Sequence, residues 1–309
     1  YFISNYVALI LHSISVLTAI FVIVVVQSTQ LHRNCKFLLS LWATGYISQF
    51  AAHATISALN TTMPFLPINK NDPQIRSYLV DVSVGSQLFC ESLEIMIATE
   101  RIISSVDPAE YHISGRSNQL LFLLSFLAFC AAFVQGIICE ANLHFLDAIA
   151  VFILEMCSLT MNHSAVTYCG RRSAELHAGS SLNARYQVKE ACELAISMQR
   201  AYLVTFIAKN TFNGIIMLTC YKSDDAHTCV PLLFPLPHYV MEFIYCTELT
   251  ISSTFLLSSL VINHPRLKLK AKVLLAKIRG STAVEDVFQP PHLNSAGRAY
   301  FDHLRKTWN

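Results

Sequence analysis

Seven long apolar stretches occupy most of this chain of 309 residues. A helix needs about 20 mostly apolar residues to cross the roughly 30 Å of hydrocarbon in a bilayer, and each stretch is long enough. Because a backbone in lipid has to form its hydrogen bonds internally, helix is expected throughout. The sequence therefore predicts an all-α membrane protein, a bundle of seven transmembrane helices. The expected spans are residues 6–27, 37–58, 77–101, 119–139, 147–169, 200–221 and 236–262.

The composition agrees with a membrane protein. The mean hydropathy is +0.45, and charged residues make up 14% of the chain, against about 25% in soluble globular domains. The formal net charge of +2 is too small to indicate nucleic acid as a partner. The lipid bilayer is the partner that these numbers favour.

The basic residues are distributed unevenly about the expected spans. Eighteen of the 22 Lys and Arg residues lie on one side, three lie on the other, and Lys209 lies within the sixth span. Since basic residues favour the cytoplasmic side, the N-terminus is expected outside and the C-terminus in the cytoplasm. The first outer loop then contains Asn60-Thr61-Thr62, an acceptor sequence for N-glycosylation on the correct side.

Two segments near the inner face are expected to be helical beyond the spans. From Ala184 the pattern reads without a break into the sixth span, which would extend that helix about 25 Å into the cytoplasm. After Pro265, apolar residues form one stripe flanked by Lys and Arg, the pattern of a helix that lies in the membrane interface. We therefore expect a transmembrane domain over 1–264, an amphipathic helix over 265–280 and a cytoplasmic tail over 281–309.

The ten cysteines follow neither a zinc nor a haem pattern, and no metal or cofactor is predicted. Cys220 and Cys229 bracket the third outer loop, on the oxidising side of the membrane. A disulfide between them is sterically easy and is predicted here.

Ionisable residues within the spans are costly, and they are usually functional or paired. Glu91 and Glu94 are three residues apart and share a face of the third helix. Lys209 is expected to pair with Glu155 or Glu248. Two interpretations stay open at this point: the charges hold the bundle together, or they bind a ligand.

The excess of acids over Lys209 favours a ligand that carries a basic group. The outer loops are short, so a small molecule in a pocket between helices is expected rather than a large docked partner. The candidate ligand-binding residues are Gln87, Glu91, Glu155, Lys209, Asn213, Tyr239 and Glu242.

Three short motifs lie at the inner ends of the helices. The pair Glu100-Arg101 closes the third helix, Tyr111 follows it, and an Arg-Tyr-Gln-x-x-Glu segment over 185–190 opens the sixth. Together they resemble the nematode serpentine chemoreceptors of the Sra superfamily, class epsilon (Sre) more than classes Srb and Srab. The sequence departs from that pattern at Ala191, where Asn is usual, and at His112, where Glu is usual.

The resemblance implies a G-protein-coupled receptor that detects a small environmental molecule and activates a heterotrimeric G protein. It also implies a plasma-membrane location, in the cilia of sensory neurons. In such a receptor Glu100 would hold Arg101 in the resting state, and release of Arg101 would let it face the G protein. Arg185 and Lys189 either contact the G protein or form a solvated charged face.

Two other functions compete with this one. A seven-helix ligand-gated channel of the insect gustatory kind has its N-terminus inside, which the distribution of Lys and Arg opposes. An intramembrane enzyme needs a nucleophile or metal motif such as His-x-x-x-His or Gly-x-Gly-Asp, and the sequence contains neither. We therefore predict no catalytic residues.

The expected topology can be tested by glycosylation mapping. Asn60 should carry a glycan that an Asn60→Gln variant lacks, seen as a mobility shift after glycosidase treatment. A tag placed after His264 should be reached by antibody only in permeabilised cells. Staining of that tag on intact cells would contradict the topology.

Overall fold

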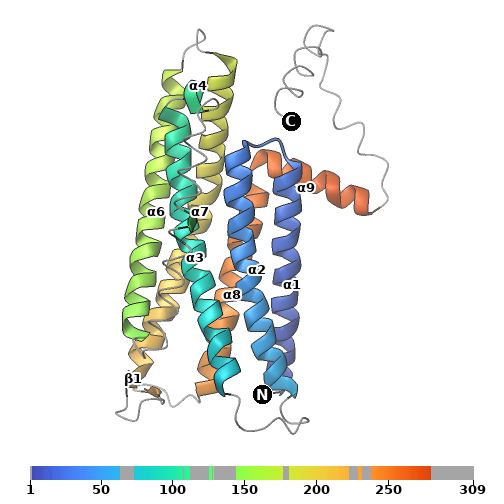
Figure 1. The fold of residues 1–309 in the computed structure, drawn as a ribbon, viewed down its shortest axis with the longest axis vertical. Helices are drawn as coiled ribbons and strands as arrows, with labels where there is room; N and C mark the ends of the chain where they lie inside the picture. The colour runs from blue at the N-terminus through green and yellow to red at the C-terminus, as the bar shows by residue number, and fades with distance from the viewer. Residues whose placement is uncertain are drawn as a thin grey trace. The chain divides into compact units, whose positions relative to one another are not determined.

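The computed structural model of the chain describes residues 2–62, 73–106, 108–111, 125, 126, 128, 144–176, 181–222, 229–231 and 238–279. These residues are helical apart from one short hairpin and the connections (Figure 1), which confirms the expected all-α class. The helices are α1 (Phe2–Ser28), α2 (Arg33–Thr62), α3 (Pro73–Val106), α4 (Pro108–Tyr111), α6 (His144–Glu175), α7 (Leu182–Thr219), α8 (His238–Asn263) and α9 (Pro265–Ile278).

Residue contacts divide the chain into two units, Tyr1–Lys268 and Leu269–Asn309. In the first unit, α1, α2, α3, α6, α7 and α8 each pack against the next, and α8 returns to α1. The six helices thus form a closed ring. Helix α3 also packs on α7 across the ring, so these two helices meet at the centre of the bundle.

Four of the seven expected spans lie within these helices. The span expected over 200–221 runs two residues past the end of α7 into β1, and the span expected over 236–262 begins two residues before α8, outside the described residues. Helices α3, α6 and α7 are longer than the spans expected for them, because each continues beyond its apolar residues. The expected helix through Ala184 is confirmed as the single helix α7, and the helix expected after Pro265 is α9. The span expected over 119–139 lies outside the described residues, except for Ser125, Phe126 and Ala128. The expected tail, 281–309, lies outside them as well.

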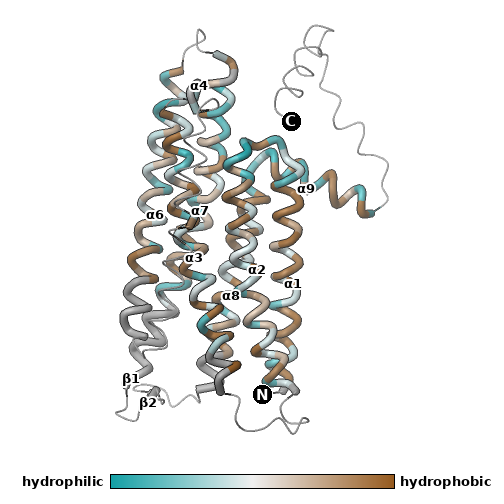
Figure 2. The backbone as a smooth tube through the Cα atoms, viewed as in Figure 1, coloured by the Kyte–Doolittle hydropathy of each residue, from teal (hydrophilic) through white to brown (hydrophobic). Residues whose placement is uncertain are grey.

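Two helices among the described residues are long and apolar enough to cross a membrane. They are Ile3–Ser28 and Phe243–Asn263, with 26 and 21 residues. Figure 2 shows the apolar character of α1 along most of its length. Helices α3, α6 and α7 carry charged residues within their lengths, among them Glu91, Glu155 and Lys209, and these lower their overall hydropathy.

In the first half of helix α1, large apolar side chains face outward and three polar side chains are buried. The outward stripe repeats every three to four residues, and the side chains of Ile3 and Leu17 are 79% and 66% exposed. The opposite stripe is buried although it contains amide, imidazole and hydroxyl groups. The outward residues are Ile3, Val7, Ile10, Ile14 and Leu17, and the buried polar residues are Asn5, His12 and Ser15.

Helices α2 and α3 approach closely at Gly45. A Cβ atom added there would lie 2.6 Å from Sγ of Cys90 and 3.3 Å from Cδ1 of Phe89. The thiol of Cys90 donates a hydrogen bond to the carbonyl of Trp42 at 3.6 Å, one turn before Gly45. A small residue is needed here because the two backbones pack through this contact, as is common between helices in membranes.

Gly45→Ala should therefore destabilise the protein by about 1–3 kcal/mol, the usual cost of overpacking a filled core. Gly170→Ala is the matched control, because an added Cβ meets nothing within 4 Å there. The control should be neutral or stabilising, since Ala favours helix over Gly by about 1 kcal/mol. Thermal unfolding followed by circular dichroism measures both changes. Equal midpoints for the two variants would contradict the close packing.

Candidate functional site

A buried cluster of charges lies at the centre of the bundle. The ammonium of Lys209 on α7 lies 3.2 Å from Oε1 of Glu155 on α6 and 3.7 Å from Oε1 of Glu91 on α3. All three side chains are at least 95% buried. The expected pairing of Lys209 with Glu155 is confirmed. Glu91, which the sequence did not identify as a partner of Lys209, completes the cluster.

Polar side chains extend the cluster to a fourth helix. Gln87 donates to Glu91 Oε1 at 3.0 Å, and the hydroxyl of Tyr245 on α8 donates to Gln87 Oε1 at 3.3 Å. On the other side, Asn210 donates to Glu155 Oε2 at 2.5 Å. The network therefore joins α3, α6, α7 and α8 through one ammonium and its two carboxylates.

Glu94, one turn along α3 from Glu91, has a structural role. Trp42 and Tyr46 on α2 donate to its Oε1 at 3.2 and 3.1 Å, and Ser158 on α6 donates to its Oε2 at 3.1 Å. Three donors from two neighbouring helices satisfy both oxygens of this carboxylate. Glu94 thus fixes α2 and α6 against α3.

Glu248 was the alternative to Glu155 as the expected partner of Lys209. Its Oε1 instead accepts a hydrogen bond from Ser252, one turn along the same helix, at 2.6 Å. The side chain is partly exposed, whereas Lys209 is held by Glu91 and Glu155. The expectation of Glu248 as the partner is therefore wrong, because α6 and α3 present their carboxylates closer to α7 than α8 does.

The central cluster can accept a further positive charge or hydrogen-bond donor. It contains two carboxylates for one ammonium, and Oε2 of Glu91 has no hydrogen-bond partner although it is buried. A buried acceptor without a partner is unfavourable by about 1–3 kcal/mol. A ligand donor at this oxygen would relieve that cost.

Four of the seven expected ligand-binding residues come together in this cluster: Gln87, Glu91, Glu155 and Lys209. The other three, Asn213, Tyr239 and Glu242, lie on α7 and α8, but their side chains fall outside the described part of the structure. Their role in ligand binding stays a prediction.

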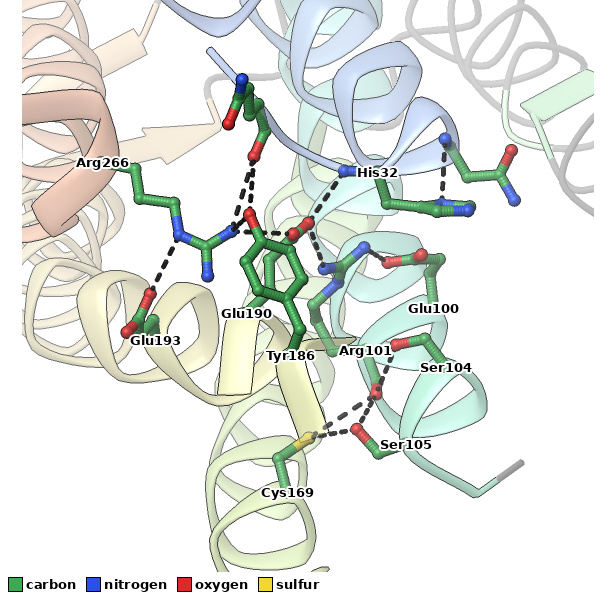
Figure 3. A network of polar contacts seen from close by, with 12 residues as sticks. His32, Glu100, Arg101, Ser104, Ser105, Cys169, Tyr186, Glu190, Glu193 and Arg266 are labelled. Carbon is green, nitrogen blue, oxygen red and sulfur yellow. Dashed lines mark hydrogen bonds and ion pairs between the residues drawn. The ribbon is translucent and has the colours of Figure 1, made fainter. Parts of the chain in front are cut away.

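A second polar network lies at the opposite end from the N-terminus and is centred on Arg101 (Figure 3). The guanidinium forms an ion pair with Glu100 and lies 3.9 Å from Oε1 of Glu190 on α7. Arg101 and Glu190 are almost fully buried. Tyr111 on α4 donates to Glu100 and accepts from Asn34 at 3.0 Å. The expected contact between Glu100 and Arg101 is confirmed.

Glu190 joins three parts of the chain at this end. Its Oε1 accepts from the backbone N–H of His32 in the α1–α2 connection at 2.9 Å, and it also faces Arg101. Its Oε2 accepts from NH1 of Arg266 at 3.1 Å. A single carboxylate thus holds α3, the α1–α2 connection and the start of α9 against α7.

Arg266 is the member of this network that the sequence did not predict. Its Nε lies 3.6 Å from Glu193, its NH1 donates to the hydroxyl of Tyr186, and its guanidinium lies 4.2 Å from the centre of the Tyr186 ring. The sequence placed Arg266 only on the basic flank of an interfacial helix. The two residues before it, His264 and Pro265, determine where its side chain lies.

His264 and Pro265 set the direction of the first turn of α9. Pro265 occupies the first helical position, where its missing N–H costs nothing. Burial lowers the pKa of His264 to about 4, an effect that the nearby Arg266 and Arg101 reinforce. The ring is therefore neutral near pH 7, and its Nδ1 accepts from the N–H of Leu267 at 3.4 Å. This cap directs Arg266 toward Glu190.

The two expected G-protein contacts on α7 are exposed, and one of them, Lys189, lies at the edge of the Arg101 network. Arg185 is exposed, and the side chain of Lys189 is 70% exposed and lies 4.0 Å from Glu193. Both side chains are accessible to a partner. A role in binding that partner stays a prediction.

The remaining expected sites lie near the end of the bundle where the chain begins (Figure 1). Strands β1 (Cys220–Lys222) and β2 (Cys229–Pro231) are antiparallel, with Cys220 opposite Pro231 and Lys222 opposite Cys229. The side chains of Cys220 and Cys229 fall outside the described residues, so the disulfide stays a prediction. Asn60 lies in the last turn of α2 rather than in a loop, and its glycosylation also stays a prediction.

Among the described residues, no group of three His, Cys, Asp or Glu side chains could hold a metal ion. In comparisons with known protein families and with curated proteins, the chain has no match.

Replacing Lys209 by Met should strongly destabilise the protein, because two buried carboxylates would lose their shared cation. Removing one partner of a buried ion pair costs about 3–5 kcal/mol. Adding Glu155→Gln should recover much of that loss, whereas Glu248→Gln, the matched control, should recover none. The yield of monodisperse protein and its thermal midpoint measure the effect. Equal rescue by both glutamine substitutions would contradict the pairing.

Proposed function

We propose that this chain is a seven-helix receptor of the plasma membrane that detects a small environmental molecule and activates a heterotrimeric G protein. The observation that carries the proposal is the combination of charged side chains buried at the centre of the bundle with large apolar side chains exposed on the outer faces of its helices. The resemblance of the inner-end motifs to the Sra superfamily supports a chemosensory role, and with it a location in sensory cilia.

Exposed apolar side chains opposite buried polar ones also occur outside the two most apolar helices. On α7, Leu203, Val204 and Ile207 are about half exposed, whereas Thr205 and Lys209 are buried. In water such a helix would expose its apolar side to solvent at a cost of about 25 cal/mol per Å². In lipid the same arrangement is favourable, because polar groups have to find partners within the protein. This supports α7 as a membrane span despite its charged residues.

The orientation follows from the distribution of charge. With the N-terminus outside, the Arg101 network lies at the cytoplasmic end, and so do the exposed Arg185 and Lys189. The basic helix α9 then begins at the inner leaflet, whose anionic lipids attract Lys and Arg. This arrangement offers a G protein a basic surface beside Arg101.

The ligand that the central cluster favours is a small molecule with a basic group. Glu91 Oε2 offers an acceptor that lacks a partner, and the cluster has two carboxylates for its one ammonium. A ligand ammonium at this oxygen would form a charge-assisted hydrogen bond, which is stronger than a neutral one. Binding there would weaken the contact between Glu91 and Lys209.

The two networks share the same pair of helices, which provides a route from ligand to G protein. Glu91 and Arg101 lie on α3, and their partners Lys209 and Glu190 lie on α7. A ligand that changes the contact between α3 and α7 at the centre also changes the contact between the same two helices at the inner end. Activation is then a shift between two bundle states, one with Arg101 held by Glu100 and Glu190 and one with Arg101 released.

Glu190→Gln should raise basal G-protein activation, because the neutral amide holds Arg101 and Arg266 less tightly. A loss of about 1 kcal/mol from the held state shifts the ratio of the two states about fivefold. Arg101→Ala should abolish or strongly reduce activation. Nucleotide exchange on the G protein in membranes, at matched surface expression, measures both variants.

Glu193→Gln is the control for these variants, since Glu193 contacts Arg266 on the exposed side of the network and is not within ion-pair distance of Arg101. It should change basal exchange much less than Glu190→Gln. Normal signalling by Arg101→Ala at equal surface level would refute the coupling role of Arg101.

A further inference from the structure

Helix α9 carries two apolar stripes on opposite sides. Placed at about 100° per residue, its apolar side chains fall into two groups whose centres are about 180° apart. Figure 2 shows hydrophobic and hydrophilic residues alternating along this helix. The first stripe consists of Leu267, Ala271, Leu274, Leu275 and Ile278, and the second consists of Leu269, Val273 and Ala276.

Basic side chains separate the two stripes along both edges. Residues 265–279 contain six basic residues and no Asp or Glu. At the same helical spacing, these six form two rows, one on each edge. The first row is Arg266, Lys270 and Lys277, and the second is Lys268, Lys272 and Arg279. A basic amphipathic helix of this kind is complementary in charge to an acidic partner.

Both stripes contain exposed apolar side chains. In the first stripe, Leu267 and Ala271 are 0% and 6% exposed, whereas Ile278 at the far end is 76% exposed. In the second stripe, Leu269 is 40% exposed, and the other two members are partly exposed. Helix α9 thus offers apolar surface on two opposite sides.

A bilayer covers only one of these sides. A helix that lies in the membrane interface buries one apolar face and keeps the opposite face in water. Whichever stripe of α9 faces lipid, the other remains in water, at a free-energy cost that grows with its exposed area. A protein that encloses the helix covers both stripes at once.

The spacing of the stripes fits a helix-binding groove. Proteins such as calmodulin hold an amphipathic helix through apolar anchors at positions i, i+4 and i+7. Both stripes of α9 have this spacing. The anchors are Leu267, Ala271 and Leu274 on one side, and Leu269, Val273 and Ala276 on the other.

We propose that α9 is the binding site for an acidic, helix-enclosing protein of the calmodulin class. Its apolar groove covers the two stripes, and its carboxylates pair with the two basic rows. The inference goes beyond the proposed receptor function, and it rests on the orientation proposed there, which places α9 in the cytoplasm.

The first turn of α9 is where this partner competes with the bundle. Leu267 is fully buried, and the guanidinium of Arg266 lies 3.1 Å from Glu190 and 3.6 Å from Glu193. A partner that encloses α9 from its first turn has to withdraw both side chains from these contacts. Since the two sets of contacts exclude each other, a change that loosens α9 in the bundle strengthens binding of the partner.

The probe for this site is calcium-loaded calmodulin, whose groove closes when calcium is removed. The full chain is reconstituted in phosphatidylcholine nanodiscs, and binding of fluorescently labelled calmodulin is measured by anisotropy. A calcium chelator provides the control. We expect saturable binding that requires calcium.

Both stripes should be needed for this binding. Leu269→Gln combined with Val273→Gln changes the second stripe, and Leu275→Gln combined with Ile278→Gln changes the exposed end of the first. Each pair should weaken binding at least about tenfold, because it removes two apolar contacts. Thermal midpoints, measured in parallel, show that each variant is folded.

A control for non-specific attraction removes basic residues elsewhere on the same side. Arg171→Gln combined with Arg185→Gln removes two exposed charges from α6 and α7. If α9 is the binding site, this variant should bind calmodulin as the natural protein does.

The competition at the first turn has its own pair of variants. Glu193→Gln should strengthen calmodulin binding about threefold, because Arg266 loses one of its partners in the bundle. Glu175→Gln is the matched control, since it removes an exposed acid of α6 whose partner is Arg172. The control should leave the affinity unchanged.

Absence of saturable binding would overturn the proposal, as would equal binding after calcium is removed. Normal binding by either stripe variant would also overturn it, because one-sided contact is what a bilayer provides; α9 would then be an interfacial helix covered by lipid. Equal affinities of the Glu193→Gln and Glu175→Gln variants would overturn the competition at Arg266. Because G-protein activation is not measured, these outcomes leave the role proposed for Arg101 unaffected.

Discussion

The interior of this bundle has to satisfy its own polar groups, and most of its architecture follows from that constraint. The outward faces of α1 and α7 are apolar, whereas Asn5, His12 and Lys209 point inward. Inside the ring, a buried charge or amide is costly unless another helix brings a partner to it. Each polar contact therefore also determines how two helices pack, and the helices cannot slide past one another without breaking such contacts.

The contacts are concentrated on α3 and α7, the two helices that meet across the ring. Glu91 and Arg101 lie ten residues apart on α3, and each faces a residue of α7, namely Lys209 and Glu190. By contrast, Glu94 binds α2 and α6 through three donors and leaves neither oxygen available. Helix α3 thus combines one fully satisfied carboxylate, which anchors it to α2 and α6, with two charged groups whose partners lie on α7.

Both ends of the bundle contain paired and unpaired polar groups, and the unpaired ones at the end with Arg101 include the amide of Gln187 and Nε2 of His264. At the end with Arg101, Glu190 is shared by two guanidinium groups and a backbone N–H. At the end where the chain begins, Asn5 and His12 each retain a nitrogen without a partner beside a small recess. The first arrangement joins α3, the α1–α2 connection and the start of α9 to α7 through one carboxylate. The central cluster lies between them and has one unpaired oxygen, on Glu91.

Local pattern determined the elements of this protein. The positions of the helices follow from runs of apolar residues, the start of α9 follows from His264 and Pro265, and the unbroken helix α7 follows from a continuous helical pattern. The pairing of Lys209 with Glu155 was one of two alternatives, since sequence gives depth along a helix but not rotation about its axis. Tertiary structure decided between them. It also brought Glu91 to Lys209, Arg266 to Glu190, Gly45 to Cys90 and His12 to Thr250, because those contacts depend on how neighbouring helices are rotated and how closely they pack, which no spacing along one helix specifies.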